Sequence, residues 1–219
     1  VGVMYHLVGL MAQEREVGMS DLVESMMPNI RRWEPQLARL IAHHLAFTIA
    51  YGPSWIVMGI VFKAGLFKYT SAGVVVIFFI LAGLAITSFS IFGAAFFRKA
   101  QLSGISTVVF ALILGIAAQI TSKYMNSGTV VILGLLFNPM TFVFLLIFIS
   151  RWEKNRMAAN LVNTPPESTW PVQGIVLLLF LILQIFLYPL FAVYVERWLY
   201  GVASRRPRRR VSWDDGQNN

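Results

Sequence analysis

Long apolar stretches alternate with short polar segments along most of the chain. A helix needs about 20 mostly apolar residues to cross the roughly 30 Å hydrocarbon core of a bilayer. Five stretches satisfy or approach this length: 39–62, 71–97, 105–121, 129–149 and 171–195. A further apolar run, 1–11, has the pattern of the last turns of a helix that begins upstream, so we expect the sequence to be a fragment. The pattern predicts an all-α polytopic membrane protein, a bundle of about five transmembrane helices.

The stretch 129–149 contains Asn138-Pro139 near its middle. Proline removes a backbone donor and disfavours helix at the preceding residue, so a break is expected here. If this stretch crosses completely, and the segment 14–39 is cytoplasmic, the 18 basic residues divide equally between the two sides. If it enters and returns, twelve of the 18 lie on the cytoplasmic side. Because Lys and Arg favour that side, we predict a re-entrant helical hairpin and a basic cytoplasmic tail at 201–219.

Charged and apolar residues alternate between 12 and 38, where the pattern differs from that of the spans. Leu22, Val23, Met26 and Met27 fall at helical spacing, and Ser20 is a candidate N-cap. Two interpretations fit about equally: a short amphipathic helix at the inner membrane surface, and a solvated loop at the headgroups. We therefore expect three regions: a helix end with a cytoplasmic segment (1–38), a transmembrane domain (39–200) and the tail (201–219).

The composition indicates that lipid is the surrounding medium for much of the chain. Hydrophobic residues make up 57% of the 219 residues and charged residues 13%, against roughly 25% charged residues in an average soluble domain. The mean hydropathy is +0.67. Cysteine is absent, which excludes disulfides, thiol nucleophiles and thiolate metal sites. The net charge of +8 includes an arginine cluster at 205–210, which is typical of a tail that binds anionic headgroups rather than of a nucleic-acid-binding face.

Few side chains within the spans could carry chemistry. No Asp, Glu, Lys or Arg lies at the centre of a span, which counts against an ion-coupled carrier or a voltage sensor. We predict that Gln184 forms an interhelical hydrogen bond, and we interpret His43 and His44 as interfacial residues rather than proton carriers. The phosphate-loop, zinc-protease and nucleophile-elbow motifs are absent. The sequence thus assigns no catalytic, metal-binding or cofactor-binding residue to this chain.

Four short motifs occur in an order and with gaps that match one family of membrane proteins. Glu14-Arg15-Glu16, followed by Met26-Met27 and by Trp33, resembles the "E-K-E" segment after that family's second transmembrane helix. The run from Phe96 to Ala100 resembles its "F-F-x-K-A" loop, and the run from Leu135 to Phe142 resembles its "S-L-L-S-P-x-A-F" element. The residues from Tyr188 to Gly201 resemble the end of its sixth helix. By these motifs the chain resembles the A subfamily of ABC transporters. Arg15 stands where that family has Lys, and Asn138 where it has Ser.

The resemblance implies the transmembrane part of an ATP-driven exporter of lipids or sterol-like molecules. ATP and Mg²⁺ would be bound by a nucleotide-binding domain absent from this chain. The implied partners are that domain, a second transmembrane half, the bilayer and a lipid-like substrate, with no nucleic acid. The implied coupling residues are Glu14, Arg15, Glu16, Val17, Leu22 and Met26, with Arg98 and Lys99 in a cytoplasmic loop.

Two other function classes compete with the exporter. The first is a motorless membrane scaffold or regulatory subunit. The second is an intramembrane enzyme, which is disfavoured because the spans lack an acid, a base and a nucleophile suited to catalysis.

Overall fold

The computed structural model describes residues 1–19, 22, 26, 33–166 and 168–200. In these residues the chain forms seven helices and no strand. The predicted all-helical fold is therefore confirmed. The helices are α1 (Gly2–Glu16), α3 (Trp33–Gly65), α4 (Ala72–Ala94), α5 (Ala100–Thr121), α6 (Ser127–Leu136), α7 (Asn138–Lys154) and α8 (Gly174–Tyr200).

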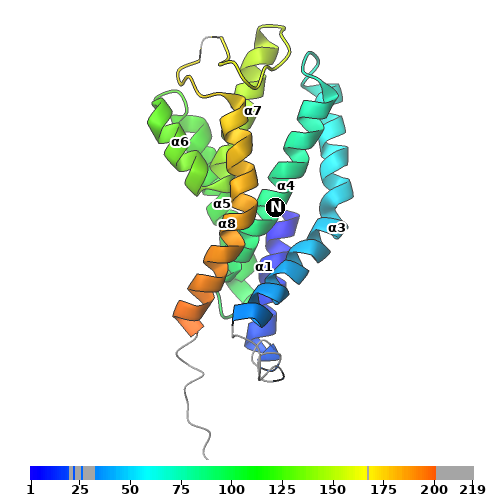
Figure 1. The fold of residues 1–219 in the computed structure, drawn as a ribbon, viewed down its shortest axis with the longest axis vertical. Coiled ribbons are helices and arrows are strands. Elements are labelled where there is room, and N and C mark those ends of the chain that lie inside the picture. The colour runs from blue at the N-terminus through cyan, green and yellow to red at the C-terminus, as the bar shows by residue number, and fades with distance from the viewer. Residues whose placement is uncertain (20–21, 23–25, 27–32, 167, 201–219) are drawn as a thin grey trace, which may run out of the picture.

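The helices run lengthwise in an elongated bundle (Figure 1). At one end, here called the proximal end, α1 and α8 finish, α3 begins, and residues 95–99 join α4 to α5. The loops 66–71, 122–126 and 155–173 lie at the opposite, distal end. Helix α4 occupies the middle of the bundle because it packs against α1, α3 and α8.

Helices α6 and α7 form a hairpin that enters the bundle from the distal end and returns to it (Figure 1). Phe137 has an extended backbone, with φ −127° and ψ 109°, and separates the two helices. Pro139 lies in the first turn of α7, where its missing N–H leaves no helical hydrogen bond unmade. The Asn126 side chain accepts a hydrogen bond from the Thr129 amide at 2.8 Å and caps α6. The predicted re-entrant hairpin is confirmed, and its break falls at 137–139.

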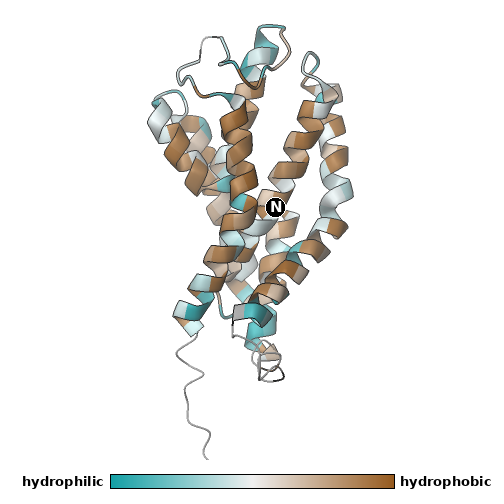
Figure 2. Cartoon of the chain, viewed as in Figure 1, coloured by the Kyte–Doolittle hydropathy of each residue, from teal (hydrophilic) through white to brown (hydrophobic). Residues whose placement is uncertain are grey.

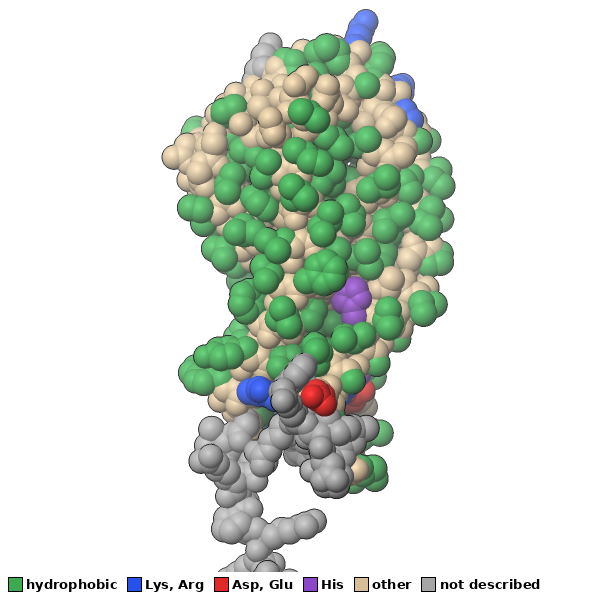
Figure 3. Space-filling model, viewed as in Figure 1, with side chains coloured by type: hydrophobic (Ala, Val, Ile, Leu, Met, Phe, Trp, Pro, Cys, Tyr) green, Lys and Arg blue, Asp and Glu red, His purple; other side chains and the backbone are tan. Residues whose placement is uncertain are grey.

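Four helices, α3, α4, α5 and α8, are each long and apolar enough to cross a membrane. Hydrophobic residues dominate the middle of the helices, whereas polar residues collect toward the two ends (Figure 2). The molecular surface in Figure 3 shows the same division, with basic and acidic side chains near the ends and hydrophobic side chains between them. Exposed apolar surface on this scale requires a lipid environment. The fold is that of a helical membrane bundle.

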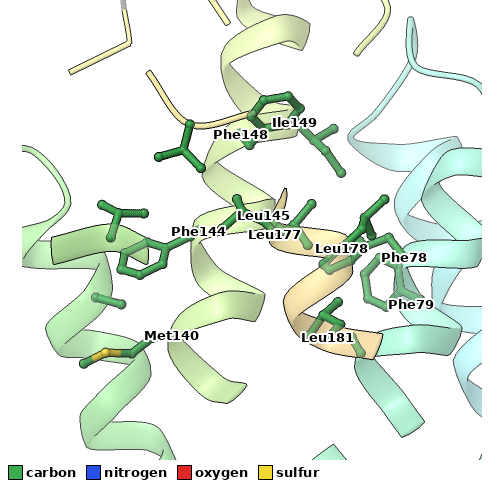
Figure 4. Close-up of a cluster of buried hydrophobic side chains, with 14 of the residues drawn as sticks. Phe78, Phe79, Met140, Phe144, Leu145, Phe148, Ile149, Leu177, Leu178 and Leu181 are labelled. Carbon is green, nitrogen blue, oxygen red and sulfur yellow. The ribbon is translucent and has the colours of Figure 1, made fainter. Parts of the chain in front are cut away.

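The main core lies between α4, α7 and α8 (Figure 4). Phe78 of α4, Phe144 of α7 and Leu177 of α8 are fully buried. Phe78 also stacks on Phe142 of α7, with 5.3 Å between the ring centroids. Aromatic side chains bury a large area each and dominate core energetics. The hairpin is therefore anchored by packing against α4 and α8 instead of standing alone in lipid.

The structure corrects the predicted boundaries of the segment 12–38. Helix α1 continues through Glu16, and α3 already begins at Trp33 instead of 39. Both ends of the predicted segment thus belong to the bundle, because side chains there find polar partners on other helices, as described below. Ser20, Val23 and Met27 lie outside the described residues, as does the tail 201–219.

Candidate functional site

The proximal end contains a buried carboxylate, Glu196, in the last turns of α8. The residue is 5% exposed. Its carboxylate accepts hydrogen bonds from three side chains on two other helices: Arg15 of α1, Arg39 of α3 at 3.1 Å, and Gln36 of α3 at 2.5 Å. A buried charge is tolerated only when it is paired and hydrogen-bonded. Glu196 therefore ties α1, α3 and α8 together at this end.

Arg15 extends the same cluster to α4. Its Nη1 group donates to the carbonyl oxygens of Ala94, at 2.5 Å, and Phe97, at 2.7 Å. The Ala94 carbonyl belongs to the last turn of α4, where a cation is favoured, and Phe97 lies in the loop that follows. The Arg15 guanidinium also lies over the Tyr200 ring, 5.7 Å from its centroid. One side chain thus joins the ends of α1, α4 and α8.

The two neighbours of Arg15 contact other helices again. The Glu14 carboxylate lies 3.0 Å from His43 Nε2 on α3. The Glu16 carboxylate accepts a hydrogen bond from the Ala100 amide, at the start of α5, at 3.1 Å. Consecutive helix residues point about 100° apart, since there are 3.6 residues per turn. Residues 14–16, which we call the junction, therefore contact α3, α4, α5 and α8 from a single turn of α1.

The structure brings two separately predicted sites together at the junction. The loop that contains Arg98 and Lys99 supplies the Phe97 carbonyl to Arg15, and the helix after it supplies the Ala100 amide to Glu16. The other predicted coupling residues, Val17, Leu22 and Met26, are exposed. The charges of the junction are thus partnered within this chain, and the apolar residues that follow them face outward.

Asn138 and Pro139 lie away from the junction, at the tip of the hairpin. Gln184 of α8 is 1% exposed, and its Nε2 group donates to the carbonyl oxygens of Gly134, at 2.7 Å, and Leu135, at 3.1 Å. Its Oε1 atom accepts from the Asn138 side-chain amide at 3.1 Å. The interhelical role predicted for Gln184 is confirmed. These bonds satisfy carbonyls that the end of α6 leaves without helical partners.

Tyr188, one helical turn after Gln184, completes this arrangement. Its hydroxyl donates to the Leu136 carbonyl at 2.9 Å and accepts from the Asn138 backbone amide at 3.0 Å. A helix break at membrane depth is tolerated only where protein or a wet cavity satisfies its backbone. Gln184 and Tyr188, here called the hairpin latch, provide that satisfaction. The sequence singled out Gln184 but missed this role of Tyr188, although a polar group one turn further along the same apolar span was a usable signal.

Two recesses lie along α5. A recess of about 420 Å³ between α1 and α5 includes Tyr5, His6, Gln13 and Gln101 in its lining. A groove of about 300 Å³ runs from the hairpin tip toward the proximal end. We call it the phenylalanine groove, because its ten lining residues include six phenylalanines: Phe89, Phe92, Gly93, Phe96, Phe97, Ser106, Thr107, Phe110, Leu136 and Phe137.

At the distal end, α7 holds two loops in place. The Glu153 carboxylate accepts hydrogen bonds from the backbone amides of Tyr69, at 3.1 Å, and Thr70, at 2.6 Å. Burial raises the pKa of Glu153, but the hydrogen bonds from Thr70 and Tyr69 and the charge of Lys63 outweigh burial and hold the pKa below its ordinary value. Arg151 lies over the buried Trp170 ring, 4.9 Å from its centroid.

The described residues contain no group of three or more His, Asp or Glu side chains placed to hold a metal ion. Comparison of the chain with protein-family models and with curated proteins finds no match. The resemblance to the A subfamily of ABC transporters therefore rests on the four sequence motifs alone.

Proposed function

We propose that this chain is the transmembrane part of an ATP-driven exporter of lipids or sterol-like molecules. In this proposal α3, α4, α5 and α8 each cross the bilayer, so that the protein is a multi-pass membrane protein, and the proximal end faces the cytoplasm. The sequence of this chain has no phosphate loop. ATP and Mg²⁺ would therefore be bound by a nucleotide-binding domain outside this chain. A second transmembrane half would complete the transporter.

The contacts of the junction with four other helices are the main support for the proposal. A motor domain that contacts the end of α1 has to transmit its displacement to the membrane helices. Arg15 links this end to α4 and α8, Glu14 links it to α3, and Glu16 links it to the start of α5. A movement applied at one helical turn would therefore reach all four helices of the described ranges that are long enough to cross the membrane.

The residues that follow the junction offer a contact surface for such a domain. Val17, Leu22 and Met26 are exposed apolar side chains that follow the junction, and the exposed cations Arg98 and Lys99 lie at the same end of the bundle. Exposed apolar residues next to charged ones are typical of protein interfaces. On the substrate side, the recess between α1 and α5 combines apolar walls with polar groups, which suits an amphiphilic molecule.

The proposal is tested in the chain joined to its in-frame nucleotide-binding domain. Replacement of Val17, Leu22 and Met26 by Asn leaves every junction contact in place. The triple variant should insert and express normally but lose most of its substrate-stimulated ATPase activity and lipid export. A matched control replaces Val162, an exposed apolar residue of the distal loop, by Asn. Unchanged export in the triple variant, or a reading frame without a phosphate loop, would refute the proposal.

A motorless scaffold or regulatory subunit is the second candidate. It is favoured by the fact that Glu14, Arg15 and Glu16 already have partners within the chain. Immobilisation of the proximal helix ends would leave the assembly of a scaffold with its partners intact, whereas it would stop transport by an exporter. Because the chain has no cysteine, a cysteine pair at exposed positions of α1 and of the loop 95–99 can be bridged by a bismaleimide without background reaction.

A further inference from the structure

We propose that the phenylalanine groove holds the acyl chain of one anionic phospholipid, whose headgroup lies on Arg98 and Lys99. This site is independent of the proposed exporter function, because it requires neither ATP nor a nucleotide-binding domain. It also differs from the recess between α1 and α5, since it is lined by α4, the loop 95–99, α5 and the hairpin tip.

The position of the groove matches one leaflet of a bilayer. Along α5 it extends from the proximal loop to Phe110, ten residues after the helix begins. At 1.5 Å per residue this corresponds to about 15 Å. A single leaflet contributes about half of the roughly 30 Å hydrocarbon core. The groove therefore begins where headgroups lie and ends near the bilayer midplane, which is the span of one acyl chain.

The lining of the groove suits a hydrocarbon chain. Seven of the ten lining residues are Phe or Leu, and the only side-chain polar groups are the hydroxyls of Ser106 and Thr107. The Thr107 hydroxyl already donates to the Ser103 carbonyl at 3.0 Å. The volume of about 300 Å³ is at the lower end of the range for ligand sites, roughly 300–1,000 Å³. Phe96, Phe110 and Leu136 of the lining are exposed, so the groove opens at the surface of the bundle, where acyl chains would be the apolar molecules in contact with it.

Two exposed cations directly follow the proximal lining residues of the groove in sequence and indicate the headgroup. Phe96 and Phe97 line the groove, and the next two residues are the exposed cations Arg98 and Lys99. Within the described ranges neither cation forms a hydrogen bond or an ion pair, and the nearby Glu16 carboxylate is engaged by the Ala100 amide. Two such cations at the membrane surface attract an anionic headgroup, and each contributes about fivefold in affinity at moderate salt.

The test uses the full 219-residue chain in nanodiscs of phosphatidylcholine. Phosphatidylserine with a photoreactive group in one acyl chain is the probe, and a phosphatidylcholine probe of the same chain length is the comparison. We expect the phosphatidylserine probe to label groove residues at least fivefold more strongly. Unlabelled phosphatidylserine should compete, whereas glycerophosphoserine, which has the headgroup without chains, should not.

Two variants separate the headgroup from the chain. R98Q/K99Q should abolish the preference for phosphatidylserine but keep the labelling by phosphatidylcholine, whereas K123Q, at an exposed lysine of the distal end, should change neither.

S106W should fill the groove and remove labelling by both probes, whereas I113W, at an exposed position of α5 outside the groove, should not. Equal labelling of the parent chain by the two probes, a preference that survives R98Q/K99Q, or competition by glycerophosphoserine would overturn the proposal. Because Arg98 and Lys99 are exposed, the R98Q/K99Q result stands even if S106W fails to fold.

Discussion

Arg15 and Glu196 form a buried ion pair between residues 181 positions apart in the chain. Their side chains are 7% and 5% exposed. The pair links the end of α1 to the end of α8 and, through the second guanidinium nitrogen of Arg15, to the end of α4. This contact fixes how the ends of α1, α4 and α8 lie relative to one another, because all three helices finish at the buried ion pair.

Replacement of one member of the pair should lower the free energy of unfolding more than replacement of both members. Among the described residues, Arg15→Met leaves Glu196 with Arg39 as its only cation, and Glu196→Leu leaves Arg15 without a carboxylate. An uncompensated buried charge typically costs about 3–5 kcal/mol, whereas replacement of a whole buried pair by apolar residues is often neutral. We expect a large loss of thermal stability in detergent for E196L and partial recovery in R15M/E196L. Glu34→Gln, at an exposed position, is the control. A double variant as unstable as the sum of the singles would argue against pairing.

Loss of the Gln184 side-chain amide should destabilise the hairpin latch. Gln184→Leu has a similar volume but removes the side-chain donor to the Leu135 carbonyl and one of the two side-chain donors to the Gly134 carbonyl, which keeps the Thr141 hydroxyl. A buried group left unsatisfied costs about 1–3 kcal/mol. Faster amide hydrogen exchange in α6 and a lower melting temperature are expected. Gln119→Leu, the same substitution at an exposed position of α5, should have neither effect.

Close contact between α3 and α4 depends on Gly83. A Cβ atom at this position would lie 2.1 Å from the Trp55 ring, so the ring would have to move. Overpacking of this kind costs about 1–3 kcal/mol. Gly83→Ala should therefore lower the melting temperature, whereas Gly73→Ala on the same helix should be neutral or slightly stabilising, because nothing lies within 4 Å of a Cβ atom there. Equal behaviour of the two variants would contradict the observed packing.

The distal contact of Glu153 should depend on pH. The pKa of Glu153 is lowered in the folded protein. Its contribution to the free energy of unfolding is therefore fully present above the pKa that Glu153 has in the unfolded chain, and it is lost as the pH falls through the pKa in the folded protein. The amides of Tyr69 and Thr70 should stay protected from hydrogen exchange through the ordinary titration range of a glutamate and lose protection only below it. Glu153→Gln should remove this pH dependence. A loss of protection at or above the ordinary glutamate pKa would show that the carboxylate is not stabilised.

The sequence predicted the membrane helices because hydropathy depends on composition over about 20 residues, not on contacts. The proline rule placed the break correctly, since the steric effect of Pro139 is local. The buried face of each span could not be predicted: on α4, Phe78 is fully buried while its neighbour Ile77 is 55% exposed, and both are equally apolar. A helix that is apolar on every side has no periodicity from which to identify its packed face.

The contacts of the junction within the chain were not predicted. A resemblance singled out Glu14, Arg15 and Glu16, but their partners are remote in sequence and no local pattern identifies them. Glu196 was not predicted as a partner, although a lone acidic residue near the end of an apolar span is unusual enough to suggest a buried pair. The segment 12–38 was assigned to one surface element because charge alternation there was taken as exposure, whereas Arg15 is buried.

The orientation of the bundle in the membrane decides whether the proposed transporter function is possible, because the junction can meet a motor domain only if the proximal end is cytoplasmic. The chain has no cysteine, so single cysteines at Lys99, Asn126 and Asn163 can be labelled in intact cells with a membrane-impermeant maleimide. We predict labelling at Asn126 and Asn163, on either side of the hairpin, and none at Lys99 until the membrane is permeabilised. Labelling of Lys99 in intact cells, or of only one of the two distal positions, would contradict the proposed orientation and, with it, the contact between the junction and a motor domain.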